Sequence, residues 1–319
     1  MIRCATESPI PIPRLMVRRS VIVAVAWLTM GTTRADAQNR GVYPLGMSAT
    51  NSGVTPASGF TYGNQLLLYA RDRAKGADGE TLAISGRNIV AMDMNSIIWV
   101  STRRVLGARY SATATIPLAR NDLTSDLQGT ISGGSGLADS YFLPVILGWD
   151  TDRTAVRAMY GFLAPTGRFH AGADDNVGSG YWTHTLSSGQ TFQLDASKTI
   201  ALSAFEMFER HTTQVGTGVH PGDTFDLDWS LMGAVVRRVD MRVQLGIAGY
   251  LARQTSAKTG PDLDPSVSAE RYAVNGVGLA AASAFPGHKA GVTLKFVKEF
   301  ANRATYEGYS AQIAATIGF

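Results

Sequence analysis

The sequence has almost no cysteine and little charge. Its only cysteine is Cys4, near the start of the chain. The rest of the chain therefore offers no disulfide framework, no thiolate metal site and no cysteine nucleophile. Charged residues make up 17% of the chain, whereas about a quarter is usual in a soluble globular protein. A chain of 319 residues that is 45% hydrophobic and holds 34 glycines either keeps much of its surface away from water or has a glycine-rich fold.

Long apolar runs and histidine clusters are missing as well. No stretch reaches the roughly 18 consecutive apolar residues that indicate a transmembrane helix. None of the five histidines lies two or four positions from another, the spacing expected of a metal site, so we predict no metal and no cofactor. His170 shares one long connection with Asp174 and Asp175, where a divalent cation could bind, but a solvated loop is the favoured interpretation.

The first 37 residues have the pattern of a secretory signal. Arg18 and Arg19 form a basic region, an apolar run follows over 21–30, and Ala35-Asp36-Ala37 is a small-x-small cleavage pattern. The run is too short to span a bilayer. We expect cleavage after Ala37, with Gln38 as the first mature residue.

This leader accounts for much of the positive charge. It carries five arginines against two acidic residues, so the net charge of +4 falls to about +1 in the mature chain. No basic field remains that would indicate nucleic acid as a partner. The Arg18-Arg19 pair could belong to a twin-arginine signal, but an ordinary basic region is favoured because little else of that motif surrounds it. Translation could start at Met1 or at Met16.

Period-two alternation dominates the rest of the chain, and helical periodicity is weak. In the stretch DTFDLDWSLMGAVV, apolar residues from Phe225 to Val235 alternate with Asp226, Asp228 and Ser230. The stretches GARYSATATIPLAR and RVQLGIAGYLAR alternate in the same way. Such alternation indicates strands with one apolar and one small or polar face.

Extending the alternation predicts about twelve strands. Each is around ten residues or longer, the length that a tilted membrane-spanning strand needs. The expected spans are 60–71, 87–102, 104–120, 136–150, 153–167, 180–195, 198–212, 223–237, 240–254, 269–285, 288–302 and 305–319.

The connections alternate between long and tight. The odd connections are long, and the even ones are short turns such as DTDR at 150–153 and DASK at 195–198; only the last, near Asn302 to Thr305, breaks this rhythm. Because lipid offers no hydrogen-bond partners, a sheet in a bilayer must close. We therefore predict an all-β fold over residues 60–319: a transmembrane antiparallel up-and-down β-barrel of about 12 strands in the bacterial outer membrane. The alternative is a soluble secreted β protein, whose strands would usually be five or six residues long.

Two further features are the segment before the first strand and the aromatic residues near the strand ends. Residues 38–59 are rich in Gly, Pro, Ser and Thr, and they form either a plug in the lumen or a disordered periplasmic tail. Aromatic residues near strand ends suit the two interfacial girdles of a barrel. The girdle candidates are Tyr69, Trp99, Tyr160, Trp229, Tyr250, Phe300, Tyr309 and Phe319.

Several loop-edge patterns resemble one outer-membrane family. They are YPLG at 43–46, Gly136 with Asp139 and Pro144, the PTG of 165–167 followed by NVGSGYW at 176–182, and HPGD at 220–223 followed by Asp228-Trp229. Together they resemble the meta-pathway phenol degradation family of transporter barrels, over most of the mature chain. The Gly136–Asp139 spacing is one residue looser than the family pattern. The resemblance implies an outer-membrane channel for small hydrophobic or aromatic compounds, moved by passive or facilitated diffusion, and it names no particular substrate.

A channel needs a polar lumen rather than a catalytic set, so we predict no enzyme. Charges inside a barrel either set selectivity or pair across the lumen and fill it, and pairing is favoured here. The inward candidates that follow from the alternation are Arg109, Arg157, Asp226, Asp228, Arg242 and Lys295.

Two rival functions remain open. The long extracellular loops could serve a structural or adhesive role. Outer-membrane lipid hydrolases of about twelve strands use a Ser–His pair, for which His184 with Ser187 or Ser188 is the nearest candidate. Their surroundings do not resemble that enzyme family.

The chain ends with EGYSAQIAATIGF, in which an aromatic and aliphatic set alternates with a small or polar set. We expect this stretch to be the closing strand, paired with the strand near residue 60. Its terminal Phe319 resembles the aromatic signal that the barrel assembly machinery recognises. The expected partners are therefore that machinery, outer-membrane lipid and lipopolysaccharide, and small hydrophobic or aromatic solutes.

Overall fold

A computed structural model describes residues 41–125, 129–261 and 263–319. The predicted leader and the first predicted mature residues, 38–40, lie outside the described residues. Among the residues described, no helix is long and apolar enough to cross a membrane.

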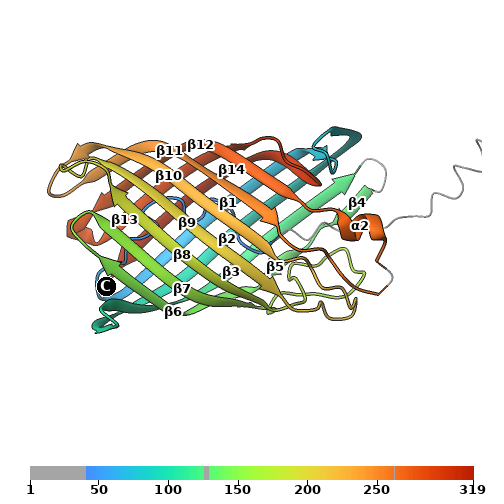
Figure 1. Ribbon diagram of the computed structural model, residues 1–319, viewed down its shortest axis with the longest axis horizontal. Helices are drawn as coiled ribbons and strands as arrows, with labels where there is room; N and C mark the ends of the chain where they lie inside the picture. The colour runs from blue at the N-terminus through green and yellow to red at the C-terminus, as the bar shows by residue number, and fades with distance from the viewer. Residues whose placement is uncertain (1–40, 126–128, 262) are drawn as a thin grey trace, which may run out of the picture. The chain divides into compact units, whose positions relative to one another are not determined.

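The described chain forms one closed antiparallel sheet of twelve long strands (Figure 1). Neighbours in sequence are neighbours in space, and β1 pairs with β14 to close the circle. The predicted fold class is confirmed. The long strands are β1 (Gly59–Lys75), β2 (Thr81–Val105), β3 (Ala108–Ser125), β6 (Ser140–Asp150), β7 (Thr154–Ala164), β8 (Thr183–Gln193), β9 (Ile200–His211), β10 (Thr224–Arg237), β11 (Arg242–Gln254), β12 (Ala273–Phe285), β13 (Ala290–Glu299) and β14 (Thr305–Gly318).

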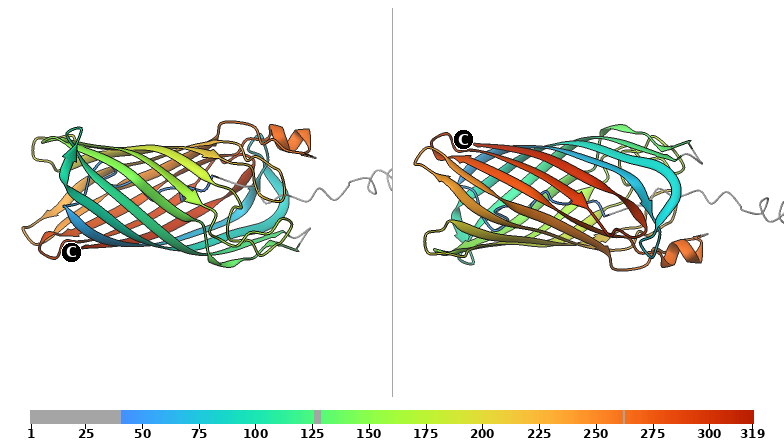
Figure 2. Two further views of the ribbon diagram at one scale, coloured as in Figure 1. Left: turned by 90° about the horizontal axis from the view of Figure 1, so that it is seen from below. Right: turned by 90° about the horizontal axis from the view of Figure 1, so that it is seen from above.

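Short strands and helices lie in the connections at the two ends of the barrel. The strand β4 (Gly129–Ser132) pairs with β3 inside a connection that we expected to be a plain loop. The strand β5 (Ser135–Leu137) also pairs with β3, and it lies at the start of the span expected as one strand over 136–150, which resumes as β6 at Ser140. The helix α2 (Pro265–Ala269) lies in an expected long connection and reaches the first residue of the strand expected over 269–285, and η1 (Pro286–His288) forms a tight turn. Figure 2 shows the tight turns at the end that carries the C-terminus and the long loops with α2 at the other end. These ends are the periplasmic and extracellular ends of an outer-membrane barrel.

The first hairpin is longer than the alternation predicted. We expected strands over 60–71 and 87–102, but β1 and β2 extend until only residues 76–80 connect them. Ion pairs support this extension, since Arg73 Nη2 lies 2.8 Å from Glu307 Oε1 on the neighbouring β14. The added residues, DRAK at 72–75 and TLAISG at 81–86, belong to the stretch expected to be a loop, but backbone pairing with adjacent strands keeps them extended.

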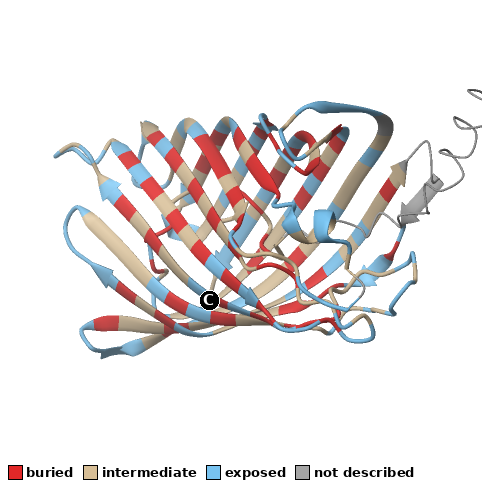
Figure 3. Cartoon of the chain, turned by 45° about the vertical axis from the view of Figure 1, so that its right-hand side comes forward, coloured by how far each residue is buried: buried red, intermediate tan, exposed pale blue. Residues whose placement is uncertain are grey.

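Buried and exposed residues alternate along many of the strands (Figure 3), because successive side chains of a strand face opposite sides of the sheet. Leu67 and Tyr69 are buried on the inner face of β1, whereas Leu66 and Leu68 are exposed on its outer face. Exposed aliphatic and aromatic side chains on the outer face are what a lipid-facing wall requires. Two girdle predictions were wrong, because Tyr69 and Tyr250 are buried on the inner face. Their position near the predicted strand ends suggested the membrane–water interface. The alternation along each strand, however, decides whether a residue faces the lumen or the lipid.

The wall is irregular between β3 and β6. Their register shifts between Ser111 and Thr113, and the β6–β7 register shifts between Phe142 and Val145. Pro144 lies in this second shift, where a residue without an N–H can be tolerated in a sheet. Beyond Thr115, β3 pairs with the short β5 instead of β6.

Candidate functional site in the barrel lumen

Residues 41–58, which we call the inner segment, lie inside the barrel without forming a strand. Near the extracellular end, Glu209 of β9 accepts hydrogen bonds from the backbone N–H groups of Val42 (2.9 Å) and Tyr43 (2.7 Å). The phenol of Tyr272 accepts one from the N–H of Gly41 at 2.7 Å. The wall thus supplies hydrogen-bond partners for backbone groups that have no sheet of their own.

The middle of the inner segment is held by one carboxylate. Asp228 of β10 accepts from the Tyr43 hydroxyl at 2.5 Å, from Gly46 N at 2.8 Å and from Ser48 N at 3.0 Å. Burial raises the pKa of the Tyr43 phenol well above its usual range, and the charge of Asp228 acts in the same direction. The phenol therefore stays protonated and keeps donating.

The carbonyl groups of the same region are also satisfied. Lys295 of β13 donates to the carbonyl oxygens of Gly46 and, at 2.9 Å, Met47. The Leu45 carbonyl accepts from Gln312 at 2.8 Å and from Tyr69 at 2.9 Å. Side chains from strands on several sides of the lumen therefore hydrogen-bond to the backbone of residues 45–47.

Wall side chains also hydrogen-bond to the backbone of the periplasmic half of the inner segment. The Ala49 carbonyl accepts from Ser230 Oγ at 2.6 Å, and the Ser52 carbonyl accepts from Arg157 Nε at 2.7 Å. Arg109 Nη1 donates to the Pro56 carbonyl at 3.1 Å, and its Nη2 lies 3.1 Å from Asp150. Apolar packing accompanies these hydrogen bonds, because Tyr43 and Leu45 belong to the main buried apolar cluster of the wall and Ala49 belongs to a second one.

The six sequence-predicted lumen residues occupy different positions. Arg109, Arg157, Asp228 and Lys295 all contact the inner segment. Asp226 is buried on the inner face, and no donor among the described residues reaches its Oδ2. Arg242 is exposed at the first position of β11, at the periplasmic rim and apart from the other five.

Several important lumen residues were not predicted. Arg71 and Glu299 form a buried ion pair of 2.9 Å, and Glu299 also accepts from Asn302 and the Tyr250 hydroxyl. Glu209 was missed as well. These residues lie near the extracellular ends of strands, where charged residues are normally taken to face water. The only signal in the sequence is that each lies an odd number of positions from the outward-facing apolar residues of its strand.

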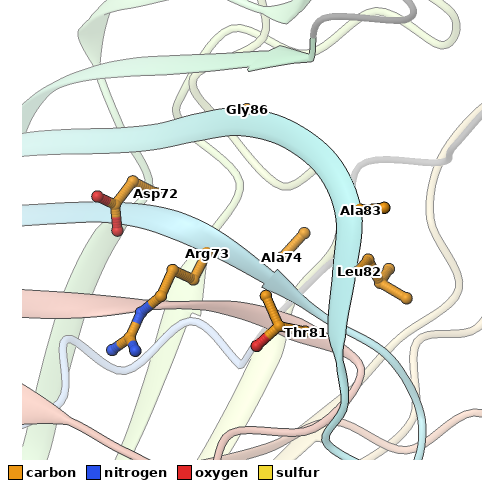
Figure 4. Close-up of a pocket in the computed structure, with 7 residues that line it drawn as sticks. All are labelled: Asp72, Arg73, Ala74, Thr81, Leu82, Ala83 and Gly86. Atoms are coloured by element: carbon orange, nitrogen blue, oxygen red, sulfur yellow. The ribbon is translucent and has the colours of Figure 1, made fainter.

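Two hollows lie outside the lumen network. One, of about 450 Å³, lies between the extracellular ends of β1 and β2 beside Asp72, Arg73 and Thr81 (Figure 4). The other, of about 380 Å³, lies at the irregular β3–β6 wall. Its lining is nearly all apolar: Ile97, Trp99, Ala112, Thr113, Ala114, Phe142, Leu143, Pro144 and Phe162.

The geometry separates the residues of the hydrolase candidate. His184 and Ser188 share the outer face of β8 but lie four residues apart, about 13 Å along an extended strand. His184 Nδ1 is hydrogen-bonded to the Tyr160 hydroxyl at 2.9 Å, and Ser188 donates to Glu206 at 2.7 Å. Ser187 lies on the opposite face of the strand, so no Ser–His pair forms here.

A family model described as "Putative MetA-pathway of phenol degradation" matches residues 71–314. The chain belongs to this family. The match spans strands from the end of β1 to most of β14, so it covers nearly the whole barrel, and it confirms the resemblance found in the sequence patterns. No curated relative matches the sequence.

Solved structures similar to this chain are outer-membrane barrels. An outer membrane channel from Pseudomonas putida F1 has a TM-score of 0.66 and 12% identity, over 85% of this chain and 98% of that one. The β domain of the Bordetella autotransporter BrkA has a TM-score of 0.53 and 11% identity, over 82% and 100%. The translocator domain of the Neisseria meningitidis autotransporter NalP has a TM-score of 0.50 and 11% identity, over 85% and 92%. The fold is therefore that of an outer-membrane barrel, and the expected location in the outer membrane is confirmed.

Proposed function

We propose that this protein is an outer-membrane channel for small hydrophobic or aromatic compounds, and that the inner segment is its plug. Passage is passive or facilitated diffusion through the lumen. The observation that carries the proposal is the inner segment itself, which lies inside a closed barrel, packs Tyr43, Leu45 and Ala49 against the wall, and exchanges hydrogen bonds with wall side chains. Water can replace such bonds, so the plug can loosen without unfolding the sheet.

The solute class has two supports. The family description refers to phenol degradation, and a phenol is a small aromatic molecule. The apolar hollow of about 380 Å³ lies on the outer face of the β3–β6 wall rather than in the lumen, and it has the aromatic side chains Trp99, Phe142 and Phe162 among its lining. Such a lining suits an apolar ring better than an ion or a sugar. The lipid, lipopolysaccharide and assembly-machinery partners expected from the sequence belong to the same proposal.

A reversible lock on the plug tests the proposal. The described residues contain no cysteine, and Ser230 Oγ lies 2.6 Å from the Ala49 carbonyl. We would introduce Ala49→Cys with Ser230→Cys and measure phenol uptake into proteoliposomes, together with single-channel conductance. Oxidation should reduce uptake to the level of empty liposomes, and a reductant should restore it, because the plug must move for the lumen to open.

The matched control links two wall residues without touching the plug. Ser96 and Thr115 face each other on β2 and β3, with their hydroxyl oxygens 2.8 Å apart. Ser96→Cys with Thr115→Cys should conduct equally when oxidised and reduced. Unchanged uptake through the locked plug would contradict gating by the inner segment. A folded barrel with neither uptake nor conductance would contradict the channel itself and favour a structural or adhesive role for the long loops.

A further inference from the structure

The outer wall is interrupted near its middle by a polar cluster on β1 and β2. It consists of Tyr62, Asn64, Asp93 and Asn95, which we call the asparagine cluster. The register places Asn64 opposite Asn95 and Leu66 opposite Asp93. Because the alternating residues Leu67 and Met94 are buried on the inner face, these polar groups lie on the face that meets lipid.

Hydrogen bonds within the cluster use only some of its side-chain donors and acceptors. Asn64 Nδ2 donates to Asp93 Oδ1 at 2.5 Å and to Asn95 Oδ1 at 3.2 Å. The Tyr62 hydroxyl donates to Asn95 Oδ1 at 2.5 Å, and Asn95 Nδ2 donates to Asp93 Oδ1 at 3.3 Å. Within the described part of the chain, no donor reaches Asn64 Oδ1 or Asp93 Oδ2, and one proton of Asn95 Nδ2 is unused. The cluster therefore presents both donors and acceptors outward.

The cluster lies deep in the membrane band. On β1, Leu66 is six residues from Phe60, whose partner across the strands is Trp99, and four from Ala70, whose partner is Tyr309. With a rise of about 3.3 Å per residue and a tilt of about 40°, Leu66 is about 15 Å above the Phe60–Trp99 pair and about 10 Å below the level of Tyr309. Lipid tails at this depth offer no hydrogen-bond partners.

An ionisable group in this position is costly unless something covers it. Charged side chains in membrane-spanning segments are rare and normally pair with other protein groups. Asparagine side chains join membrane segments by hydrogen bonds across their interface. The expected cover is therefore another protein surface with matching donors and acceptors.

We propose that the β1–β2 wall binds a second copy of this chain in a two-fold symmetric dimer through the asparagine cluster. A two-fold interface brings the same patch together from both copies. The unused N–H of Asn95 in one copy then meets the free oxygen of Asp93 or Asn64 in the other, and the reverse pair forms by symmetry. On β3, Ile116 opposite Asn95 and Leu118 opposite Asp93 flank the cluster on the same face, and both are exposed, so they give the interface an apolar rim.

A second polar cluster on the far wall shows why β1–β2 is preferred. It contains Ser188, Gln190 and Glu206 on β8 and β9. Ser188 donates to Glu206 at 2.7 Å, and Gln190 Nε2 donates to Glu206 at 2.9 Å and to Ser188 at 3.0 Å. Its side-chain donors are thus all used, and only acceptors point outward. Two copies of this cluster cannot satisfy each other.

The two walls are well separated, which makes the second one a matched control. Going round the sheet, β3, β6 and β7 lie between them on one side and five strands on the other. Leu66 on β1 is 48% exposed beside the asparagine cluster, and Leu186 on β8 is 64% exposed beside the other one. Both are outward-facing leucines in a region without native cysteine.

The experiment is cysteine crosslinking in native outer membranes. Leu66→Cys should give a covalent dimer with a short bis-maleimide, and Leu186→Cys should stay monomeric. Adding Asn64→Leu and Asn95→Leu to Leu66→Cys should abolish the dimer, while adding Ser188→Ala and Gln190→Leu should leave it intact. Heat-modifiable migration of each variant verifies that the barrel is folded, and leucine suits a lipid-facing position.

Four outcomes would overturn the dimer. Leu66→Cys could give no dimer, or one unaffected by the asparagine substitutions. The dimer could form equally well through Leu186→Cys. The Leu66→Cys product could contain a different protein, identified by mass spectrometry. None of these outcomes bears on conduction through the lumen, so the dimer and the channel are tested separately.

Discussion

At the scale of single residues, glycine allows the inner segment to pass so close to the wall. Gly46 has a φ of +84°, and a Cβ added there would lie 2.8 Å from Gln312 Nε2. Gly53 approaches β7 still more closely, because a Cβ there would lie 1.9 Å from the backbone oxygen of Ala155. Real Cβ atoms do not come this near, so each position requires a residue without one.

The substitution Gly53→Ala should therefore displace the inner segment from its place. The clash is with backbone on both β7 and β8, which cannot move without breaking the sheet, so the segment must move instead. We expect a higher single-channel conductance and faster phenol uptake, with normal heat-modifiable migration.

The matched variant is Gly287→Ala in the turn between β12 and β13, where an added Cβ would have no neighbour within 4 Å. It should behave like the wild type. Equal conductance in both variants would mean that the contact at Gly53 does not hold the lumen closed.

At the scale of elements, β14 is the closing strand. It pairs with β1 from Thr61 opposite Gly318 to Lys75 opposite Thr305, with one register shift. The N–H of Phe319 donates to the Phe60 carbonyl at 2.8 Å, while its side chain is 71% exposed. The ring thus adds little to packing in the folded barrel.

Deleting Phe319 should impair assembly into the outer membrane while export to the periplasm continues. One backbone hydrogen bond is lost with it, which contributes only about 1 kcal/mol, so a large assembly defect would come from lost recognition. The measurement is the ratio of folded, heat-modifiable barrel to unfolded periplasmic chain.

Phe319→Tyr keeps an aromatic ring and should assemble normally, whereas Phe319→Ala keeps the hydrogen bond but should resemble the deletion. Normal assembly of Phe319→Ala would remove the signal assigned to this residue.

At the scale of the whole molecule, the sheet and the inner segment have separate sources of stability. The barrel closes through backbone pairing between neighbouring strands all the way round. The inner segment is attached through side chains such as Asp228, Arg157 and Lys295, none of which is needed for strand pairing. Closure removes every open edge of the sheet and does not require a filled lumen.

Deletion of residues 42–57 should therefore leave a folded barrel with a larger and more persistent conductance. Asp228, Lys295 and Arg157 then face water, which solvates them in place of the segment. Heat-modifiable migration and single-channel recording measure the two parts of this prediction.

If the deletion variant no longer folds, the inner segment is part of the barrel's core rather than a plug. In that case the cysteine lock between positions 49 and 230, which leaves every native backbone group in place, remains the decisive test of gating.

Most of the barrel could be predicted from alternation, and so could some of the lumen. Parity placed Asp228 and Lys295 inward, and the structure shows both of them in contact with the inner segment. Parity also placed Arg242 inward, but that residue lies exposed at the first position of its strand. The polar groups on the outer wall were missed, because Asn64 and Asp93 look like lumen residues unless their own strand is counted from its apolar face.

The sequence by itself determined about twelve long alternating strands joined by long and tight connections in turn, and such strands must close into a barrel when they lie in lipid, which offers no hydrogen-bond partners. Only the tertiary structure decided what lies inside the barrel and what interrupts its outer wall. Residues 41–58 carry no periodic pattern, and their path depends on contacts with side chains more than a hundred positions away. The asparagine cluster likewise exists only because the β1–β2 register brings Asn64 beside Asp93 and Asn95.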